Sequence, residues 1–192
     1  MKNVIILGAS GNIAGHVIDI LLKKDDINLT LFLRNARRLR NKDVSKCRIV
    51  AGDVLDYMQL KEAISGQDIV YGNLSGDLEA MAKNIVKAMD ETRVKKLIFI
   101  SSIGIYDLPL RPVLKPYRKA ADVIEASGLE YTILRPTWFT NADEVDYETT
   151  RKGEPEKGSI VSQKSLATLI TKIVETPEQY TRENLGVNKP NS

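Results

Sequence analysis

Six short apolar runs occur in the first 134 residues, and they constrain the fold more than any other feature of the sequence. The runs are Val4–Leu7, Leu29–Leu33, Ile49–Ala51, Ile69–Tyr71, Leu97–Ile100 and Tyr131–Leu134. They are continuous rather than alternating with polar residues, which is typical of parallel strands covered on both faces. The sequence therefore predicts a buried parallel sheet.

Amphipathic stretches with helical periodicity follow several of these runs. The first carries Ile13, Val17, Ile20 and Leu21 on one face, and similar faces occur at residues 78–89 and 166–174. Asp77 and Ser162 stand where N-caps are expected, and Pro177 ends the third helix. Strands that alternate with helices form right-handed crossovers. We therefore predict an α/β fold, a Rossmann-type doubly wound parallel sheet with the strand order 3-2-1-4-5-6.

The length of 192 residues fits one domain, 1–192. A long and mostly polar connection, residues 135–161, follows the last apolar run. Connections of this length usually have a function, so we interpret it as a substrate-side rim rather than a second domain.

Composition narrows the environment of the protein. A single cysteine, Cys47, cannot make an internal disulfide, which indicates a reducing compartment. No apolar run approaches the roughly 20 residues that span a bilayer. The net charge of +3 is too small to indicate a polyanionic partner. We expect a cytoplasmic protein without a membrane partner.

A glycine-rich turn follows the first run and opens the first helix. Its sequence is Gly8-Ala9-Ser10-Gly11-Asn12-Ile13-Ala14-Gly15. Gly8 permits a tight turn, Gly11 lets the backbone approach a pyrophosphate, and Ala14 with Gly15 keeps the helix close to the strand. The helix N-terminus then offers N–H groups and a partial positive charge. The pattern predicts dinucleotide binding by Gly8, Ser10, Gly11, Asn12 and Ile13.

The second strand ends at Arg34, nineteen residues after Gly15. Folds of this type that prefer NAD carry an acid here, whereas an arginine suits the 2′-phosphate of NADP. No acid lies between Leu29 and Lys42. We therefore predict NADP(H) as the cofactor, with NADPH preferred over NADH. Arg34 would hold the phosphate, Arg37 would share it, and Arg38 and Arg40 would form a solvated basic surface.

Two further segments are expected to contact the cofactor. Asp53 closes the third strand, where its carboxylate either accepts the adenine amino group, with Val54 against the ring, or caps the helix that starts near Asp56. A turn of small residues that includes Leu74 and Ser75 follows the fourth strand, where the middle of the cofactor should pass.

These segments resemble the atypical short-chain dehydrogenases/reductases, particularly the NmrA-like NAD(P)H-binding members. The matching pieces are Gly8–Gly15, the strand end at Arg34, Gly52-Asp53, Phe99–Ser102 and Ala126–Pro136. The resemblance spans about residues 1–175. It implies that the nicotinamide lies between the ends of strands four, five and six, near Ser101 and Pro136.

The resemblance is less complete for catalysis. Ser101 and Ser102 match the serine region of the wider superfamily, but its Tyr-x-x-x-Lys pair is missing, because Ala121 stands four residues after Tyr117. We consider Ser102 and Tyr117 as candidate catalytic residues, Tyr117 with Lys119 or Lys115 nearby. Alternatively, Tyr117 only lines the cleft.

Trp138 and Phe139 follow Pro136 and should lie over the nicotinamide face. They offer apolar area for a flat or hydrophobic substrate, and they equally suit a core plug or a homodimer contact. No metal site is predicted, because the lone His16 has neither a cysteine nor a second histidine beside it in the sequence.

Two functions remain open from the sequence. The first is an NADP(H)-dependent oxidoreductase of a small carbonyl, quinone or flavin-like substrate. The second is a redox sensor that binds NADP(H) without turnover and signals to a regulatory protein partner. Residues 34–48 hold seven basic residues, but few aromatic residues lie among them, which does not favour nucleic acid as a partner.

Overall fold

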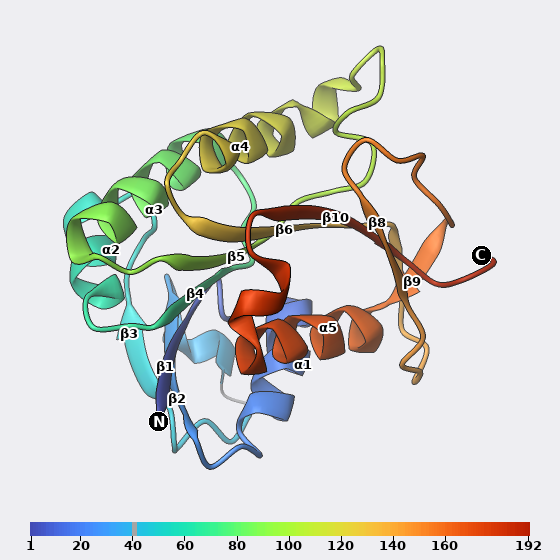
Figure 1. Cartoon of the computed structure of the whole chain (residues 1–192). Coiled ribbons are helices and arrows are strands. Elements are labelled where there is room, and N and C mark those ends of the chain that lie inside the picture. Colours follow the sequence, from blue (N-terminus) through green and yellow to red (C-terminus); the bar gives the residue numbers. More distant parts are fainter. Residues whose placement is uncertain (40–41) are drawn as a thin grey trace.

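The computed structural model describes residues 1–39 and 42–192, so Arg40 lies outside the described residues. An eight-stranded sheet forms its centre, in the order β3-β2-β1-β4-β5-β6-β10-β8 (Figure 1). Neighbouring strands are parallel except for the pair β10 and β8. The strands in this order are β3 (Arg48–Ala51), β2 (Ile27–Leu33), β1 (Lys2–Leu7), β4 (Ile69–Gly72), β5 (Lys96–Ile100), β6 (Glu130–Pro136), β10 (Glu183–Asn188) and β8 (Glu148–Arg151). The predicted order 3-2-1-4-5-6 is confirmed, and two strands extend it.

Helices cover both faces of the sheet (Figure 1). Helices α1 (Asn12–Leu21) and α5 (Gln163–Glu175) lie on one face, and α2 (Tyr57–Ile64), α3 (Leu78–Thr92) and α4 (Lys115–Glu125) lie on the other. Short 3-10 helices occupy Ala36–Leu39, Pro112–Leu114 and Pro177–Tyr180. Along β1, Val4 and Ile6 are buried on the α1/α5 side, and Ile5 and Leu7 are buried on the other. This two-sided burial explains why the strands are continuous apolar runs.

Polar side chains fix where three helices begin. Asp77 accepts a hydrogen bond from the Ala80 N–H at 3.1 Å, which confirms it as the N-cap of α3. Asp56 accepts one from the Gln59 N–H at 3.1 Å and caps α2. The alternative in which Asp53 caps α2 is therefore wrong, because the N-cap of this helix lies three residues later, at Asp56.

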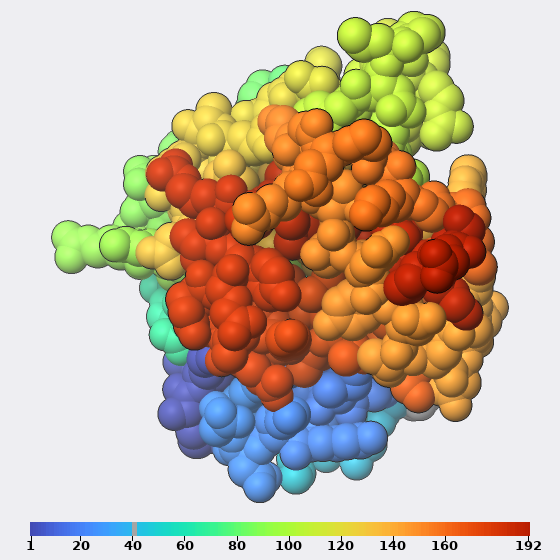
Figure 2. Space-filling model, turned by 45° about the vertical axis from the view of Figure 1, so that its right-hand side comes forward, coloured from blue at the N-terminus to red at the C-terminus, as the bar shows by residue number. Residues whose placement is uncertain are grey.

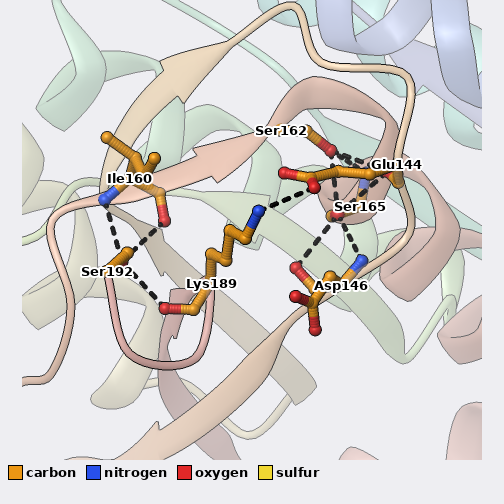
Figure 3. A network of polar contacts seen from close by, with 7 residues as sticks. All are labelled: Glu144, Asp146, Ile160, Ser162, Ser165, Lys189 and Ser192. Atoms are coloured by element: carbon orange, nitrogen blue, oxygen red, sulfur yellow. Dashed lines mark hydrogen bonds and ion pairs between the residues drawn. The ribbon is translucent and has the colours of Figure 1, made fainter.

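The Ser162 hydroxyl caps α5 and also holds the preceding segment (Figure 3). It accepts a hydrogen bond from the Ser165 N–H at 2.9 Å and donates one to the Glu144 carbonyl at 2.9 Å. The Lys189 ammonium reaches the Glu144 carboxylate at 2.7 Å. This network fastens residues 144–146 to the start of α5 and to the segment after β10.

The connection at residues 135–161 is more regular than its polar sequence predicted. It contains β7 (Trp138–Thr140), which pairs in parallel with β9 (Ile160–Ser162), and β8, which pairs with β10. β8 has the sequence Glu-Thr-Thr-Arg and lies at the sheet edge, so it lacks the apolar run that indicated the first six strands. The sequence analysis did not identify the strands of this connection.

A buried ion pair ties this connection to the loop after β5. The Arg135 guanidinium is 2% exposed and pairs with the Glu156 carboxylate, which also accepts a hydrogen bond from the Gly104 N–H at 3.0 Å. Because a buried cation needs a partner, Glu156 ties the loop after β8 to the end of β6 and to the loop after β5. Among residues 1–39 and 42–192, no helix has the length and apolar character needed to cross a membrane.

Candidate functional site: a dinucleotide cleft

A cleft of about 410 Å³ lies at the carboxyl ends of β1 to β4. The strand order reverses direction between β1 and β4, and ligands of doubly wound folds bind in the crevice at this switch point. The lining residues are Gly8, Ser10, Gly11, Phe32, Leu33, Arg34, Asn35, Arg38, Gly52, Asp53, Val54, Asn73, Leu74, Ser75 and Met81. The cleft therefore brings together most of the residues that the sequence assigned to the cofactor.

The glycine turn packs unusually close to the loop after β4. Gly8 has φ +79°, and a Cβ there would lie 2.1 Å from the Asn73 carbonyl oxygen. A Cβ on Gly11 would lie 2.3 Å from Asn73 Nδ2. Contact with the Asn73 backbone and the positive φ thus require a glycine at position 8, whereas a side chain at position 11 would have to displace the Asn73 side chain. The sequence predicted the glycines but did not single out Asn73, whose signal is its place directly after the fourth strand.

The first turn of α1 is suited to an anion. Gly11 is its N-cap, and no side chain of a described residue caps its first N–H groups. The first turn also holds no acidic residue. The N–H groups and the positive end of the helix dipole therefore face the turn without competition from protein carboxylates.

Asn12, Ile13 and Gly15 are not placed as we expected. Asn12 lines an adjoining hollow of about 460 Å³ rather than the cleft, and the Ile13 side chain is buried in the core. Only the backbone N–H groups of Asn12 and Ile13 could therefore contact a phosphate in the cleft. Gly15 makes room for Lys42, whose Nζ donates to the Gly15 carbonyl at 3.0 Å and to Asp19 at 2.7 Å. The prediction that Gly15 serves contact with the strand was wrong.

Arg34 lines the cleft where the second strand ends, as its position predicted. The next arginine on the cleft is Arg38, whereas Arg37 is not among its lining residues. The chain turns into the 3-10 helix Ala36–Leu39 directly after β2, with the Arg37 N–H donating to the Asn35 Oδ1 at 3.0 Å. This tight turn puts Arg38 rather than Arg37 on the wall of the cleft, which is the reverse of the placement that we expected. Neither Arg34 nor Arg38 forms an ion pair with a residue in the described part of the chain.

Asp53 is held by its own loop where the cleft meets the end of β3. Its Oδ1 accepts a hydrogen bond from the Leu55 N–H at 2.9 Å, and its N–H donates to Gln59 Oε1 at 3.2 Å. Asn84 of α3 donates to the Val54 carbonyl at 3.0 Å. These bonds order the loop and leave the Asp53 Oδ2 without a protein donor among the described residues.

Close packing sets the floor of this end of the cleft. A Cβ on Gly52 would lie 2.6 Å from the Phe32 ring, so only a glycine lets the backbone pack directly against that ring. Met81 of α3 lines the opposite wall. Phe32 and Met81 were not assigned by sequence, because each has the pattern of an ordinary core position.

Ser101, Ser102 and Pro136 lie farther along the same edge of the sheet, at the ends of β5 and β6. The Ser101 N–H donates to the Leu134 carbonyl at 2.7 Å, and the Ile103 N–H donates to the Pro136 carbonyl at 3.1 Å, which joins the two strand ends. The Ser101 hydroxyl is buried and has no partner among the described residues. Ser102 Oγ donates to the Ile103 carbonyl at 3.2 Å.

Tyr117 is half-buried on α4, and it has no lysine partner on that helix. The Lys119 ammonium lies 2.8 Å from the Glu79 carboxylate of α3, and this hydrogen bond raises the pKa of Lys119. Lys115 is exposed at the start of α4. The structure therefore shows that Lys119 faces α3.

Large apolar side chains are exposed on the loops after β5 and β6. Trp138 is 73% exposed and Phe139 is 44% exposed, so the interpretation of these residues as a core plug was wrong. Leu108 and Val113 are also exposed, on the loop after β5 that projects in yellow-green in Figure 2. A substrate contact and a homodimer contact both remain open for Trp138 and Phe139.

No group of three or more His, Cys, Asp or Glu residues in the described ranges is arranged to hold a metal ion. The chemistry of the cleft instead consists of backbone N–H groups, two guanidinium groups and one carboxylate. These groups complement the phosphates and the adenine of a dinucleotide.

Comparison with known proteins agrees with this assignment. Residues 8–177 match the model of a family described as NAD(P)H-binding, and the chain belongs to this family. A Rossmann-fold NAD(P)-binding family protein from Shigella flexneri is 51% identical, with a TM-score of 0.93 over 100% of this chain and 95% of that one. A short-chain dehydrogenase/reductase from Veillonella parvula in complex with NADP is 26% identical, with a TM-score of 0.85 over 99% and 95% of the two chains.

The similar curated proteins include larger plant reductases. Cinnamoyl-CoA reductase 1 of Petunia hybrida is 35% identical over 118 residues, which are 53% of this chain and 35% of that protein. Phenylcoumaran benzylic ether reductase PT1 of Pinus taeda is 28% identical over 156 residues, which are 72% and 49%. The chain thus spans at most about half the length of these two relatives.

We predict that Gly11→Val abolishes dinucleotide binding while the fold survives. The new side chain would fill the space beside the turn, and the nearest atom, Asn73 Nδ2, is the end of a side chain that can move. Calorimetric titration with NADPH measures the binding, and circular dichroism checks the fold. Gly128→Val is the matched control, because a Cβ at Gly128 has no described atom within 4 Å. An unchanged affinity in Gly11→Val would contradict the assignment of this turn.

Proposed function

We propose that this protein is an NADP(H)-dependent oxidoreductase that reduces a small carbonyl, quinone or flavin-like acceptor. The observation that carries the proposal is the pair Arg34 and Arg38 on the wall of the dinucleotide cleft. A 2′-phosphate is the only group that distinguishes NADP from NAD, and two cations that form no ion pair with a described residue are suited to bind it.

Different segments of the protein would bind different parts of the cofactor. The turn from Gly8 to Ile13 would hold the pyrophosphate through its N–H groups, and Asp53 would accept the adenine amino group. Leu74 and Ser75 would line the middle of the cofactor. Ser101 and Pro136 would border the nicotinamide, which when bound supplies a hydride to the acceptor.

The acceptor would bind at the substrate-side rim, over the joined ends of β5 and β6. The exposed rings of Trp138 and Phe139 provide apolar area for a flat substrate. The Arg135–Glu156 ion pair and the hydrogen bond from Gly104 would keep this rim in place. Ser102 and Tyr117 are the side chains proposed to deliver a proton, whereas an acceptor that needs only a hydride would require neither.

A non-catalytic redox sensor is the second candidate, and one observation favours it. Ala121 stands four residues after Tyr117, where the activating lysine of a Tyr-x-x-x-Lys pair would be, and Lys119 of the same helix is engaged by Glu79. Such a sensor would bind NADP(H) in the same cleft and pass its redox state to a protein partner.

NADPH oxidation against a panel of quinones, flavins, biliverdin-like tetrapyrroles and aldehydes separates the two candidates. Turnover with any member of the panel supports the oxidoreductase. Tight NADPH binding without turnover across the panel contradicts the proposed substrate classes and favours the sensor. Absorbance at the NADPH band measures the rate, and calorimetry measures the binding.

Arg34→Ala is predicted to weaken NADPH binding by about 10–150-fold and to leave NADH binding nearly unchanged. This range corresponds to the loss of one charge-assisted hydrogen bond, which is worth about 1.5–3 kcal/mol. Arg38→Ala should have an effect of the same kind. Arg37→Ala is the control on the same short helix and should change the ratio of the two affinities least. Equal losses of affinity for NADPH and NADH in Arg34→Ala would contradict the assignment of Arg34 to the 2′-phosphate.

Tyr117→Phe tests the proposed proton donor. If Tyr117 protonates the acceptor, its loss lowers the turnover rate by about 10²–10⁴-fold and barely changes cofactor affinity, because only a transition-state interaction is removed. Steady-state kinetics with an active acceptor measures the effect, and Ser102→Ala run in parallel tests the other candidate. A decrease in turnover rate of less than about threefold would show that Tyr117 is not the proton donor and only lines the cleft.

A further inference from the structure

A second cavity, of about 670 Å³, lies at the opposite edge of the sheet, where β1, β4, β5 and β6 begin. Its lining residues are Met1, Lys2, Asp26, Asp68, Ile69, Lys95, Lys96, Glu130, Pro177 and Glu178. It shares none of the described residues with the dinucleotide cleft, which lies at the carboxyl ends of the same strands. Nothing in the proposed oxidoreductase function uses this cavity.

Lys96 is the buried amine of this cavity. The residue is only 4% exposed, and its Nζ donates to the Thr132 hydroxyl at 2.9 Å. That hydroxyl in turn donates to the Tyr180 carbonyl at 2.6 Å. Within the described part of the chain, Thr132 is the one hydrogen-bond acceptor of Lys96, although an ammonium group carries three N–H donors. A charged Lys96 is therefore poorly solvated.

Charged groups from several elements surround Lys96. Glu130 of β6 and Glu178 of the 3-10 helix after α5 favour the charged amine, but neither forms an ion pair with it. Burial outweighs both carboxylates and lowers the pKa of Lys96 to about 8. The other charged residues of the cavity are Lys2, Asp26, Asp68 and Lys95, with the ammonium of Lys2 bound to the Val174 and Glu175 carbonyls.

We propose that Lys96 is an acylation site that accepts a small, uncharged acyl group from an acyl thioester. The neutral amine attacks the thioester carbonyl carbon, the carbon–sulfur bond breaks, and an amide bond forms. The amine loses one proton, and the departing thiolate takes it up as a thiol. No oxidant or reductant is involved.

The surroundings of Lys96 determine which acyl group fits. An amide is uncharged, so acylation removes the cost of burying an ammonium group. Glu130 and Glu178 would repel an acyl group that ends in a carboxylate, which favours acetyl and similar neutral groups over dicarboxylic ones. Lys95 lines the same cavity but is exposed, so it lacks the burial that lowers the pKa of Lys96.

Treatment of the whole, folded protein with N,S-diacetylcysteamine over pH 7–10 tests the proposal. Mass spectrometry of fragment ions compares acetylation at Lys96 with that at Lys95. At pH 8 an amine of pKa 8 is half neutral, whereas a lysine of ordinary pKa is neutral in well under 1% of molecules. We expect Lys96 to react about tenfold faster or more at pH 8 and to reach its plateau near pH 9. Lys95 should continue to gain reactivity up to pH 10.

Two controls show whether the fold causes this selectivity. In urea, where the protein is unfolded, Lys95 and Lys96 should react at similar rates. Glu130→Gln removes a carboxylate that favours the charged amine, so it should raise the rate at Lys96 at pH 7.5. Glu62→Gln, at an exposed glutamate of α2, should leave that rate unchanged. Acetylation of Lys95 in the folded protein at pH 8 without acetylation of Lys96 would overturn the proposal.

Discussion

The contact between the β1–α1 turn and the loop after β4 determines how this site is built. Gly8 and Gly11 lie so close to Asn73 that a Cβ at either position would overlap it. A side chain at either glycine is thereby excluded from the point where the sheet order reverses, and the backbone of the turn lines the crevice. The other parts of the site, from Arg34 at one end to Ser101 and Pro136 at the other, take their positions from the parallel strands β2, β5 and β6 of the same sheet.

The charged groups of the cleft are mostly cationic. They are the positive end of α1 and the guanidinium groups of Arg34 and Arg38, and such groups are suited to a ligand that carries phosphates. Trp138 and Phe139 are exposed on β7 and are not among the lining residues of this cleft. The Arg135–Glu156 pair and the hydrogen bond from the Gly104 N–H tie the loop after β8 to β6 and to the loop after β5.

Most of the fold could be predicted from sequence because the first six strands are buried on both faces and therefore appear as apolar runs. β8 could not be predicted in this way, since an edge strand of Glu-Thr-Thr-Arg has no such run. Within the site, Arg34 was predictable because the strand end fixes it. Arg38 rather than Arg37 lines the cleft because of a 3-10 helix that no local sequence pattern indicated. Asn73 was not predicted because it contacts Gly8, which lies 65 residues earlier in the sequence.

Calorimetric titration of the unmodified protein with NADPH and NADH at low and at high salt tests the central claim most directly. The account predicts that NADPH binds more tightly than NADH by about tenfold or more at low salt, as one charge-assisted hydrogen bond would give. The preference should shrink as salt is added, because both arginines lie near the surface, where ions screen their charge. Equal affinity for the two cofactors at low salt would contradict the account.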